Sequence, residues 1–394
     1  MLVLVLNVGS SSLKGSIVDS VDLTALAKDE VSLGTDATRT KGLERIVRSL
    51  LEKLAVTSAQ PALPRGPGRG KDPPRPQGGR GYSIEAVGHR VVHGGTKFRS
   101  AIRVNDRVLK GIEALAEFAP LHNPLAAATI RAAQAALPKI PQVAAFDTAF
   151  HATLSQEQFV YPVPWRWSRE YGIRRFGFHG LSVEWSMRRT SELLGRPAAE
   201  LGLLVAHLGS GCSVTAVWNG RSVATSMGLT PMEGLMMGTR SGSIDPGILL
   251  YMLRTRRAGR QELETALDHE SGLVGVSGRA VGMRELEKAA ADGNQRARLA
   301  IDMFVSRAAA GIAAAATALP RLDALVFTGG IGEHSASVRS GIVRRLAPLG
   351  LGVVAATYVR NDAVISASGS AVAVLRVEAR EDAVIARQTA ELLY

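Results

Sequence analysis

The chain has 394 residues, more than one ordinary hydrophobic core supports, so we expect two domains. Apolar residues make up 46% and aromatic residues 5%, which is typical of an α/β protein, and the single cysteine excludes an intramolecular disulfide framework. The net charge of +12 suits either nucleic acid or polyanionic phosphate substrates. Because the basic residues are scattered and no DNA- or RNA-reading module is recognisable, we expect no nucleic-acid partner.

The first half opens as strand, turn, strand. Residues 2–6 form an apolar run that leads into the turn NVGSSSLK (7–14), and residues 13–19 and 23–31 are expected to be further strands. Apolar residues recur at helical spacing from Leu43 to Leu54, which predicts an amphipathic helix.

Residues 61–81 differ in composition from the rest of the chain. They include six Pro, six Gly and four Arg and almost no apolar side chains. Such a segment cannot bury enough surface to offset its loss of conformational entropy, so we expect a disordered insertion. Binding of anions such as nucleic acid is the alternative reading of its arginines.

Order is expected to resume with a strand at 84–92, which runs into the glycine turn HRVVHGG (89–95). Helical patterns follow at 108–118 and 125–137. A short apolar strand at 143–146 then delivers Asp147 at its C-terminal end, the edge of the sheet where α/β proteins usually form their sites.

The second half repeats the opening plan. After a helix at 183–194, for which Ser182 is the expected N-cap, a strand at 203–206 leads into the turn HLGSGCSV (207–214). Strands at 213–218 and 221–226 are joined by Asn219–Gly220, a strong type I′ hairpin signal. The pattern continues with an Ala-rich helix at 299–319 and a strand at 324–327, which leads into a third glycine turn, FTGGIGEH (327–334). It ends with a last helix that begins near Glu381.

The apolar runs are too short for membrane insertion. Residues 2–6 are shorter than a signal-peptide core, and residues 308–319 cannot span a bilayer. We therefore expect a cytoplasmic protein with no membrane partner.

Glycine–serine turns after apolar strands place bare N–H groups and small hydroxyls where a phosphate can approach. Each turn alone is equally typical of a simple tight turn. The recurrence in two similar contexts indicates two related halves that bind one nucleotide, although neither a Walker loop nor a dinucleotide fingerprint is present.

Four polar residues in these contexts are candidates for phosphoryl-transfer chemistry. Arg90 and Arg240 lie in glycine-rich segments, and a guanidinium matches both carboxylate and phosphate. His179, in RFGFHGLS (175–182), could donate to a transferring phosphoryl group, and Asp147 follows a buried strand. Each candidate also has a purely structural interpretation. The arginines would form surface ion pairs, His179 would make a hydrogen bond within its loop, and Asp147 would cap the turn that follows it. The absence of HExxH or paired-cysteine spacings favours Mg²⁺ over a caged transition metal.

These residues, in this order, resemble the acetate kinase family of the acetate-and-sugar-kinase, Hsp70 and actin superfamily. The matching motifs cover nearly the whole chain outside residues 61–81: NVGSSSLK, VGHRVVHGG, LHNP (121–124), FDTAFH (146–151), RRFGFHG, HLGSGCS, GLMMGTRSGSIDPG (234–247), GVSG (275–278) and TGGIGE.

The resemblance implies a role for each matching position. It assigns Arg90, Asp147, His179 and Arg240 to catalysis and Asn7 and Glu381 to the metal. It assigns five residues to the substrate: Arg90, Val92, Leu121, Phe178 and Pro231. It assigns twelve to the nucleotide: Lys14, His207, Leu208, Gly209, Ser210, Gly211, Arg284, Gly330, Ile331, Gly332, Glu333 and His334.

The resemblance further implies two duplicated ribonuclease-H-like (actin-like ATPase) α/β domains with the active site in a cleft between them. The N-terminal acyl-substrate domain would span 1–150 and the nucleotide-binding domain 151–394, with the last helix (381–394) packing back on the first domain. The implied activity is reversible, Mg²⁺-dependent phosphoryl transfer from ATP to acetate by direct in-line transfer, with Mn²⁺ as an alternative metal. A homodimer coupled to phosphate acetyltransferase in acetyl-CoA biosynthesis is also implied.

Two alternatives stay open at this point. A propionate or butyrate kinase of the same family would share all of these motifs, although Val92 is bulky enough to favour acetate. A nucleotide-binding regulator with weak turnover is the second alternative, because Gly282 and His334 replace the Asp and Asn that similar kinases carry.

Overall fold

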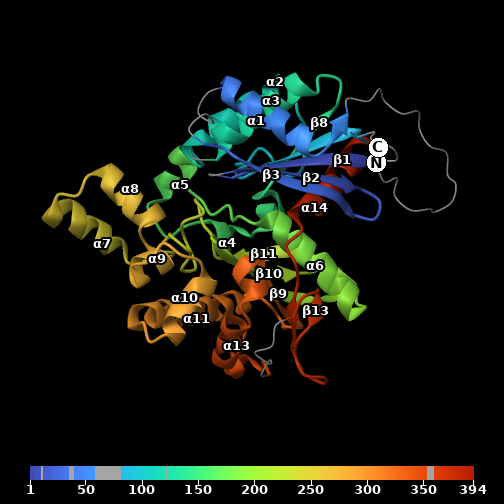
Figure 1. Cartoon of the computed structure of the whole chain (residues 1–394). Helices are drawn as coiled ribbons and strands as arrows, with labels where there is room; N and C mark the ends of the chain where they lie inside the picture. The colour runs from blue at the N-terminus through green and yellow to red at the C-terminus, as the bar shows by residue number, and fades with distance from the viewer. Residues whose placement is uncertain (10–11, 35–39, 58–80, 121, 353–358) are drawn as a thin grey trace. The chain divides into compact units, whose positions relative to one another are not determined.

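A computed structural model describes residues 1–9, 12–34, 40–57, 81–120, 122–352 and 359–394 (Figure 1). Residues 61–80 of the predicted insertion, and Leu121, lie outside the described residues. The chain forms two compact units: unit 1 comprises Met1–Ala149 and Arg380–Tyr394, and unit 2 comprises Phe150–Ala379.

Unit 1 is built on a six-stranded sheet in the order β3-β2-β1-β6-β8-β7. The strands β1, β6 and β8 run parallel, and β2, β3 and β7 join them antiparallel. The bounds are β1 Leu2–Val8, β2 Ser12–Asp19, β3 Ala25–Ser32, β6 Ala86–Val91, β7 Ile102–Arg103 and β8 Gln142–Phe146, with a separate two-stranded ladder of β4 (Val56–Thr57) and β5 (Tyr82–Ser83).

Helices cover this sheet. The helices α1 (Thr40–Lys53) and α3 (Asn123–Ala136) pack on each other and on the sheet, and α2 (Asp106–Ala114) packs on α3 (Figure 1). Their leucine, valine and alanine side chains form one buried core with those of the strands, in which Leu4, Ile17 and Leu50 are fully buried.

The C-terminal helix α14 (Glu381–Leu393) packs on β1, β2, β6 and β8 of the same sheet. Gly88 of β6 makes this approach close: a Cβ there would lie 2.5 Å from Cγ2 of Ile385 and 2.8 Å from Oγ1 of Thr389. The last helix of the chain therefore belongs to unit 1, although the segment that precedes it in sequence belongs to unit 2.

Unit 2 repeats the sheet plan of unit 1. Its order is β11-β10-β9-β12-β14-β13, with β9, β12 and β14 parallel and the other three antiparallel to their neighbours. The bounds are β9 Gly202–Leu208, β10 Cys212–Trp218, β11 Arg221–Thr225, β12 Ala324–Thr328, β13 Ala363–Val364 and β14 Ala373–Arg376. The predicted fold, two duplicated domains of the same α/β design, is confirmed.

The helices of unit 2 include the long α6 (Gly180–Leu194) and α11 (Gln295–Ala316), which both contact β9. The others are α4 Gln156–Phe159, α5 Trp165–Tyr171, α7 Pro246–Tyr251, α8 Arg260–His269, α9 Gly272–Ser277, α10 Met283–Ala291, α12 Gly329–His334 and α13 Ala336–Arg345. The two units also contain the short 3₁₀ helices η2 (Leu115–Glu117), η3 (Ala149–Thr153), η4 (Ala198–Glu200) and η6 (Ala347–Leu349) and the π-helix η5 (Met252–Arg256). Among the described helices, α11 alone has the length and mean hydropathy of a membrane span, but it packs against α9, α10, α13 and two strands.

Two local predictions differ from the structure. Helix α6 begins at Gly180, not at 183, and its N-cap is His179 and not Ser182. The third glycine turn is a short helix, α12, and not a loop. The Asn219–Gly220 hairpin is confirmed, with both residues at positive φ (51° and 73°) between the paired Trp218 and Arg221.

Candidate active site

In unit 1, three predicted site residues meet at the C-terminal edge of the sheet. Asn7 is the penultimate residue of β1, Arg90 lies near the end of β6, and Asp147 directly follows β8. Since β1, β6 and β8 are parallel neighbours, their C-terminal ends lie together. Glu381, the first residue of α14, completes the group because α14 packs across the same strands.

Arg90 is the centre of this group. Its Nε and Nη2 donate to the two carboxylate oxygens of Asp147 at 3.1 and 2.5 Å, a bidentate ion pair. Its Nη1 donates to Oδ1 of Asn7 at 3.2 Å, and its Nε lies 3.4 Å from Oε2 of Glu381. Asn7 in turn donates from Nδ2 to Glu381 at 3.5 Å. The guanidinium is therefore fixed from three sides.

The charges in this group do not balance, because two carboxylates face one guanidinium. Burial raises the pKa of Asp147 to about 6, Arg90 opposes the shift, and Glu381 adds to it. Burial alone would lower the pKa of Arg90, but Asp147 and Glu381 raise it above its ordinary value. A divalent cation would offset the excess negative charge, and amide and carboxylate oxygens are ligands that suit Mg²⁺. Asn7 and Glu381 therefore fit the metal role predicted for them.

The other unit 1 candidates lie around this group. Lys14 stands opposite Asn7 in the β1–β2 ladder, mostly exposed, with Nζ 3.9 Å from Glu30. Val92 follows β6 directly and is buried. Leu121 lies outside the described residues, so its predicted place in the acyl pocket stays a prediction.

In unit 2, the predicted phosphate turn joins β9 to β10. His207 and Leu208 end β9, and the turn closes with a hydrogen bond from Gly209 N to Gly211 O at 3.0 Å. The Leu208 side chain is fully buried, which leaves its backbone for any contact with a ligand. Ser210 O accepts from Gly238 N at 3.0 Å, so the loop that carries Arg240 is tied to this turn.

His179 and His207 form a stacked pair beside the turn, with ring centroids 4.1 Å apart. His179 adopts a left-handed conformation (φ 59°) at the start of α6 and makes no capping hydrogen bond there. Ser182, the expected cap, lies inside the helix, and its hydroxyl bonds His207 Nδ1 at 2.8 Å. The expected cap was wrong because the serine is used in this tertiary contact.

Arg240, Pro231 and Phe178 also lie in unit 2. Arg240 donates from Nη1 to the Pro231 carbonyl at 3.4 Å, and its Nε pairs with Asp268 at 3.2 Å. Phe178 is buried, and its carbonyl lies 2.9 Å from Nε2 of the buried His151. Burial raises the pKa of Cys212 to about 12, and the charge of Arg240 opposes this shift.

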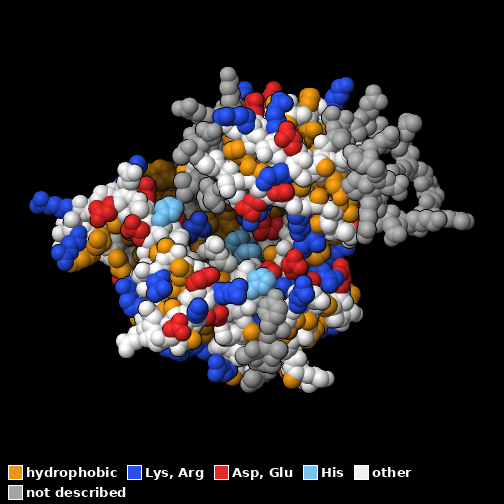
Figure 2. All heavy atoms as spheres, viewed as in Figure 1, with side chains coloured by type: hydrophobic (Ala, Val, Ile, Leu, Met, Phe, Trp, Pro, Cys, Tyr) orange, Lys and Arg blue, Asp and Glu red, His pale blue; other side chains and the backbone are white. Residues whose placement is uncertain are grey.

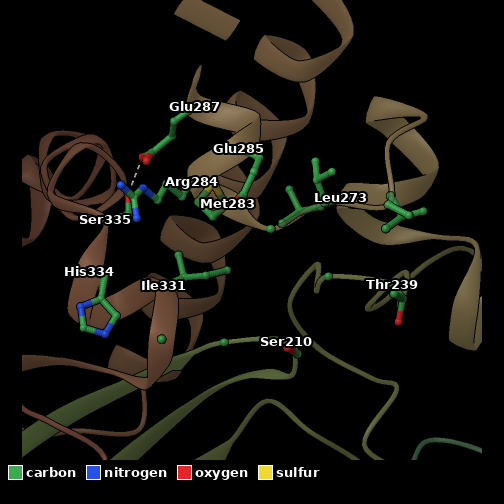
Figure 3. A pocket seen from close by; sticks show the side chains of 17 residues that line it. Ser210, Thr239, Leu273, Met283, Arg284, Glu285, Glu287, Ile331, His334 and Ser335 are labelled. Atoms are coloured by element: carbon green, nitrogen blue, oxygen red, sulfur yellow. Dashed lines mark hydrogen bonds between the residues drawn. The ribbon is translucent and has the colours of Figure 1, made fainter. Parts of the chain in front are cut away.

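A cavity of about 1210 Å³ in unit 2 brings together six of the predicted nucleotide residues, Gly209, Ser210, Arg284, Gly330, Ile331 and His334. Figure 3 shows its walls: Met283, Arg284 and Glu287 come from α10, and Ile331 and His334 from α12. The volume exceeds that of a typical small-ligand pocket, and Gly209 and Ser210 of the glycine turn are part of the lining.

Not every predicted nucleotide residue lies on this wall. The Glu333 carboxylate points into a buried network, where it accepts from the Ala379 N–H at 3.0 Å and pairs with Arg376 at 3.4 Å. Gly332 is also absent from the lining, and its carbonyl accepts from the buried Arg339 at 2.9 Å. Both residues hold the shape of α12 instead of lining the cavity.

Sequence reasoning missed several cavity residues, notably Thr239, Leu273, Val274, Glu287 and Ser335. Glu287 Oε1 accepts from Ser335 Oγ at 2.5 Å and also from Ser337, which joins α10 to the start of α13 (Figure 3). Thr239 lies in the motif GLMMGTRSGSIDPG and Leu273 and Val274 lie beside GVSG, but Glu287 and Ser335 come from other elements and belong to no motif.

The chain is similar to known proteins over its whole length. A model of the acetokinase family matches residues 2–387. An acetate kinase from Deinococcus deserti is 44% identical over 416 aligned positions, covering 100% of this chain and 98% of that relative. The crystal structure of Porphyromonas gingivalis acetate kinase superposes with a TM-score of 0.86 at 32% identity, and that of a Francisella tularensis propionate kinase with 0.83 at 33%; each alignment covers 100% of both chains.

Proposed function

The chain belongs to the acetokinase family, and we propose that it transfers the γ-phosphoryl group of ATP reversibly to acetate, giving acetyl phosphate and ADP. The observation that carries the proposal is the guanidinium of Arg90, oriented by Asp147 at the C-terminal edge of the unit 1 sheet. A guanidinium in this position can take a carboxylate substrate in two parallel hydrogen bonds.

The acetate oxygen attacks the γ-phosphorus in line while the bond to the β–γ bridging oxygen breaks, and ADP leaves with that electron pair. Carboxylic acids with a pKa near 4 are ionised at neutral pH, so the nucleophile needs no general base. Asp147 therefore orients Arg90 and does not remove a proton. The main obstacle is repulsion between two anions, which Arg90, Arg240 and His179 offset.

The remaining site residues take up the two substrates. We assign the cavity bounded by Arg284, Ile331 and His334 to the adenosine portion and the 209–211 turn, with Lys14, to the phosphates. We assign Val92, Leu121, Phe178 and Pro231 to recognition of the methyl group of acetate. Asn7 and Glu381 would hold Mg²⁺, or Mn²⁺ in its place, which when bound neutralises phosphate charge.

The test is hydroxylamine trapping of the acyl phosphate formed from Mg·ATP and acetate, propionate or butyrate. We expect hydroxamate with acetate, less with propionate, least with butyrate and none without a divalent metal. Arg240→Ala should lose most of the turnover and keep its affinity for ATP. Absence of hydroxamate from all three acids would sink the proposal and favour a nucleotide-binding regulator.

Propionate kinase is the second candidate, favoured by the 33% identity to the Francisella tularensis enzyme over the whole chain. One methylene changes binding by only about 1–3 kcal/mol, so both acids should react. The ratio of kcat/KM for acetate and propionate decides between the two.

We also propose a cytoplasmic homodimer whose product serves a phosphate acetyltransferase, an enzyme that passes the acetyl group to coenzyme A. Hydrophobic side chains lie exposed among charged ones over α7 and α8 (Figure 2). Ile248, Leu250 and Tyr251 of α7 are 44–62% exposed, which favours burial against a second copy. Light scattering after size-exclusion chromatography tests the dimer, and a monomer at all concentrations would contradict it.

A further inference from the structure

Two serines anchor the stacked histidines of unit 2 in a crossed arrangement. Ser213 of β10 lies with Oγ 3.0 Å from Nδ1 of His179, which precedes α6. Ser182 of α6 lies with Oγ 2.8 Å from Nδ1 of His207 in β9. Both serines are fully buried. Each imidazole therefore has a serine hydroxyl at its Nδ1. The helix that follows His179 supplies the serine for His207, and the strand that follows the His207 strand supplies the serine for His179.

The opposite ring nitrogens face the glycine segments. A Cβ built on Gly329 would lie 3.1 Å from Nε2 of His207, and one on Gly211 would lie 3.4 Å from Nε2 of His179. These are the glycines at the start of α12 and in the β9–β10 turn. A side chain at Gly329 would crowd the His207 ring and the Leu208 carbonyl, whereas one at Gly211 would be in ordinary contact with the His179 ring. Both Nε2 edges therefore lie next to the glycine backbone that would carry phosphate.

A hydroxyl is a distinctive partner for Nδ1. It can donate to the lone pair of a neutral imidazole, and after rotation it can accept from the Nδ1–H of an imidazolium. A carbonyl, by contrast, could only accept, and would hold the neutral ring with its proton on Nδ1. With a serine, Nε2 can carry a proton in both charge states and donate it to an anionic oxygen.

We propose that Ser182 and Ser213 are positioning residues that orient His207 and His179 so that each presents Nε2–H to the phosphoryl group in transfer. This inference rests on the proposed function, which supplies the phosphoryl group. The serines touch neither substrate and act through the imidazoles. The stacking fixes the plane of the rings, and the two hydroxyls fix which edge of each ring faces the phosphate.

The experiment compares Ser182→Ala and Ser213→Ala with Ser186→Ala. Ser186 lies one turn after Ser182 on α6, is equally buried, and its hydroxyl has no hydrogen-bond partner among the described residues. We expect kcat to fall about 10- to 100-fold in the first two variants, with the KM for acetate nearly unchanged. Ser186→Ala should keep the wild-type kcat, which separates the orienting role from loss of a buried hydroxyl.

A second readout does not depend on turnover. In the free protein labelled with ¹⁵N-histidine, removal of either serine should shift the ring nitrogen resonances of one histidine, and Ser186→Ala should shift none. Ser182→Thr and Ser213→Thr retain the hydroxyl and should recover most of kcat. If an alanine variant does not fold, the kcat and the ¹⁵N-histidine spectrum of the corresponding threonine variant are compared with those of the wild type.

The inference is overturned if Ser182→Ala and Ser213→Ala match Ser186→Ala in kcat and in the ¹⁵N spectrum. It is also overturned if kcat falls while the imidazole resonances stay in place. An inactive wild-type protein with serine-dependent resonances would instead reject the proposed function and leave the hydrogen-bonded geometry standing.

Discussion

At the scale of single residues, Arg90 illustrates how placement and charge act together. Its guanidinium makes ion pairs with Asp147 and Glu381 and donates to Asn7, all at the ends of parallel strands or of the helix packed on them. A bidentate pair fixes orientation as well as distance. The side chain is therefore pre-oriented before a substrate carboxylate arrives.

Asp147→Asn tests whether this carboxylate orients Arg90 or acts as a base. Asparagine keeps one acceptor but turns an amide toward the guanidinium, so we expect kcat/KM for acetate to fall about 10- to 100-fold, with KM raised. Its pH profile between pH 7.5 and 9 should keep its shape, since acetate and the Asp147 of the wild type are both ionised in that range. A loss nearer 10⁴-fold at unchanged KM, recovered as pH rises, would instead identify a general base.

Val92→Ala tests the predicted limit on acyl chain length. Val92 is buried just after β6, and removal of two methyl groups should raise the butyrate-to-acetate ratio of kcat/KM about tenfold. The matched control is Val91→Ala. Val91 belongs to the hydrophobic core, so this substitution should lower the melting temperature without changing the ratio. An unchanged ratio in Val92→Ala would remove Val92 from the acyl pocket.

At the scale of elements, α12 shows how a short helix is held by its neighbours. Arg339 of α13 donates to the carbonyls of Gly332 and Glu333, and Arg376 at the end of β14 pairs with the Glu333 carboxylate. The same carboxylate accepts from Ala379, the residue before unit 1 resumes. Two buried arginines thus hold the cavity wall formed by Ile331 and His334.

Glu333→Gln should disturb this element without touching the cavity. The glutamine can still accept from Ala379, but its amide faces Arg376, which keeps only Asp362 as an anionic partner. We expect the free energy of unfolding to fall by about 2 kcal/mol and the KM for ATP to rise severalfold, with the KM for acetate unchanged. Denaturant titration and steady-state kinetics measure both.

The control for this variant is Glu378→Gln, the same change of charge on an exposed side chain two residues after Arg376. It should behave as the wild type in both assays. If Glu333→Gln raised the KM for ATP with no loss of stability, Glu333 would be a direct nucleotide ligand, as the motif alone predicts.

At the scale of the whole molecule, each unit contains a buried histidine whose pKa is lowered by the fold. Burial lowers the pKa of His89 in unit 1 and of His151 in unit 2, each to about 4, although hydrogen bonds to Gln142 and to the Phe178 carbonyl oppose the shift. A histidine with a lower pKa in the folded state binds its proton more readily when unfolded. Acid therefore favours unfolding of both units.

We expect the two histidines to leave the free energy of unfolding undiminished above pH 6.5. Between pH 6.5 and 4 each histidine should lower it by up to about 3 kcal/mol. Asp147 opposes this trend, because its raised pKa favours the protonated folded state below pH 6, but two histidines outweigh one aspartate. Urea titrations at pH 7.5 and 5 measure the difference. His151→Gln should reduce it by more than half, because Asp147 already offsets part of the loss from the two histidines, and equal stability at both pH values would contradict the burial of neutral rings.

Local sequence patterns were sufficient to predict those features of structure and chemistry that a few consecutive residues determine. The two strand–turn–strand units, the Asn219–Gly220 hairpin and the family itself, through its long contiguous motifs, were all predicted from the sequence and are confirmed. These features depend on backbone propensity and on residues adjacent in the chain, so they can be read without knowledge of distant contacts.

Tertiary structure decided the features that depend on residues far apart. Ser182 lies inside α6 and not at its cap because His207 binds its hydroxyl, and Glu333 turns from the cavity because Arg376 and Ala379 are present. Glu287 and Ser335 reach the cavity from different helices. In each case an ion pair or hydrogen bond across the fold outweighs a local preference of about 1 kcal/mol, and no window of consecutive residues contains both partners.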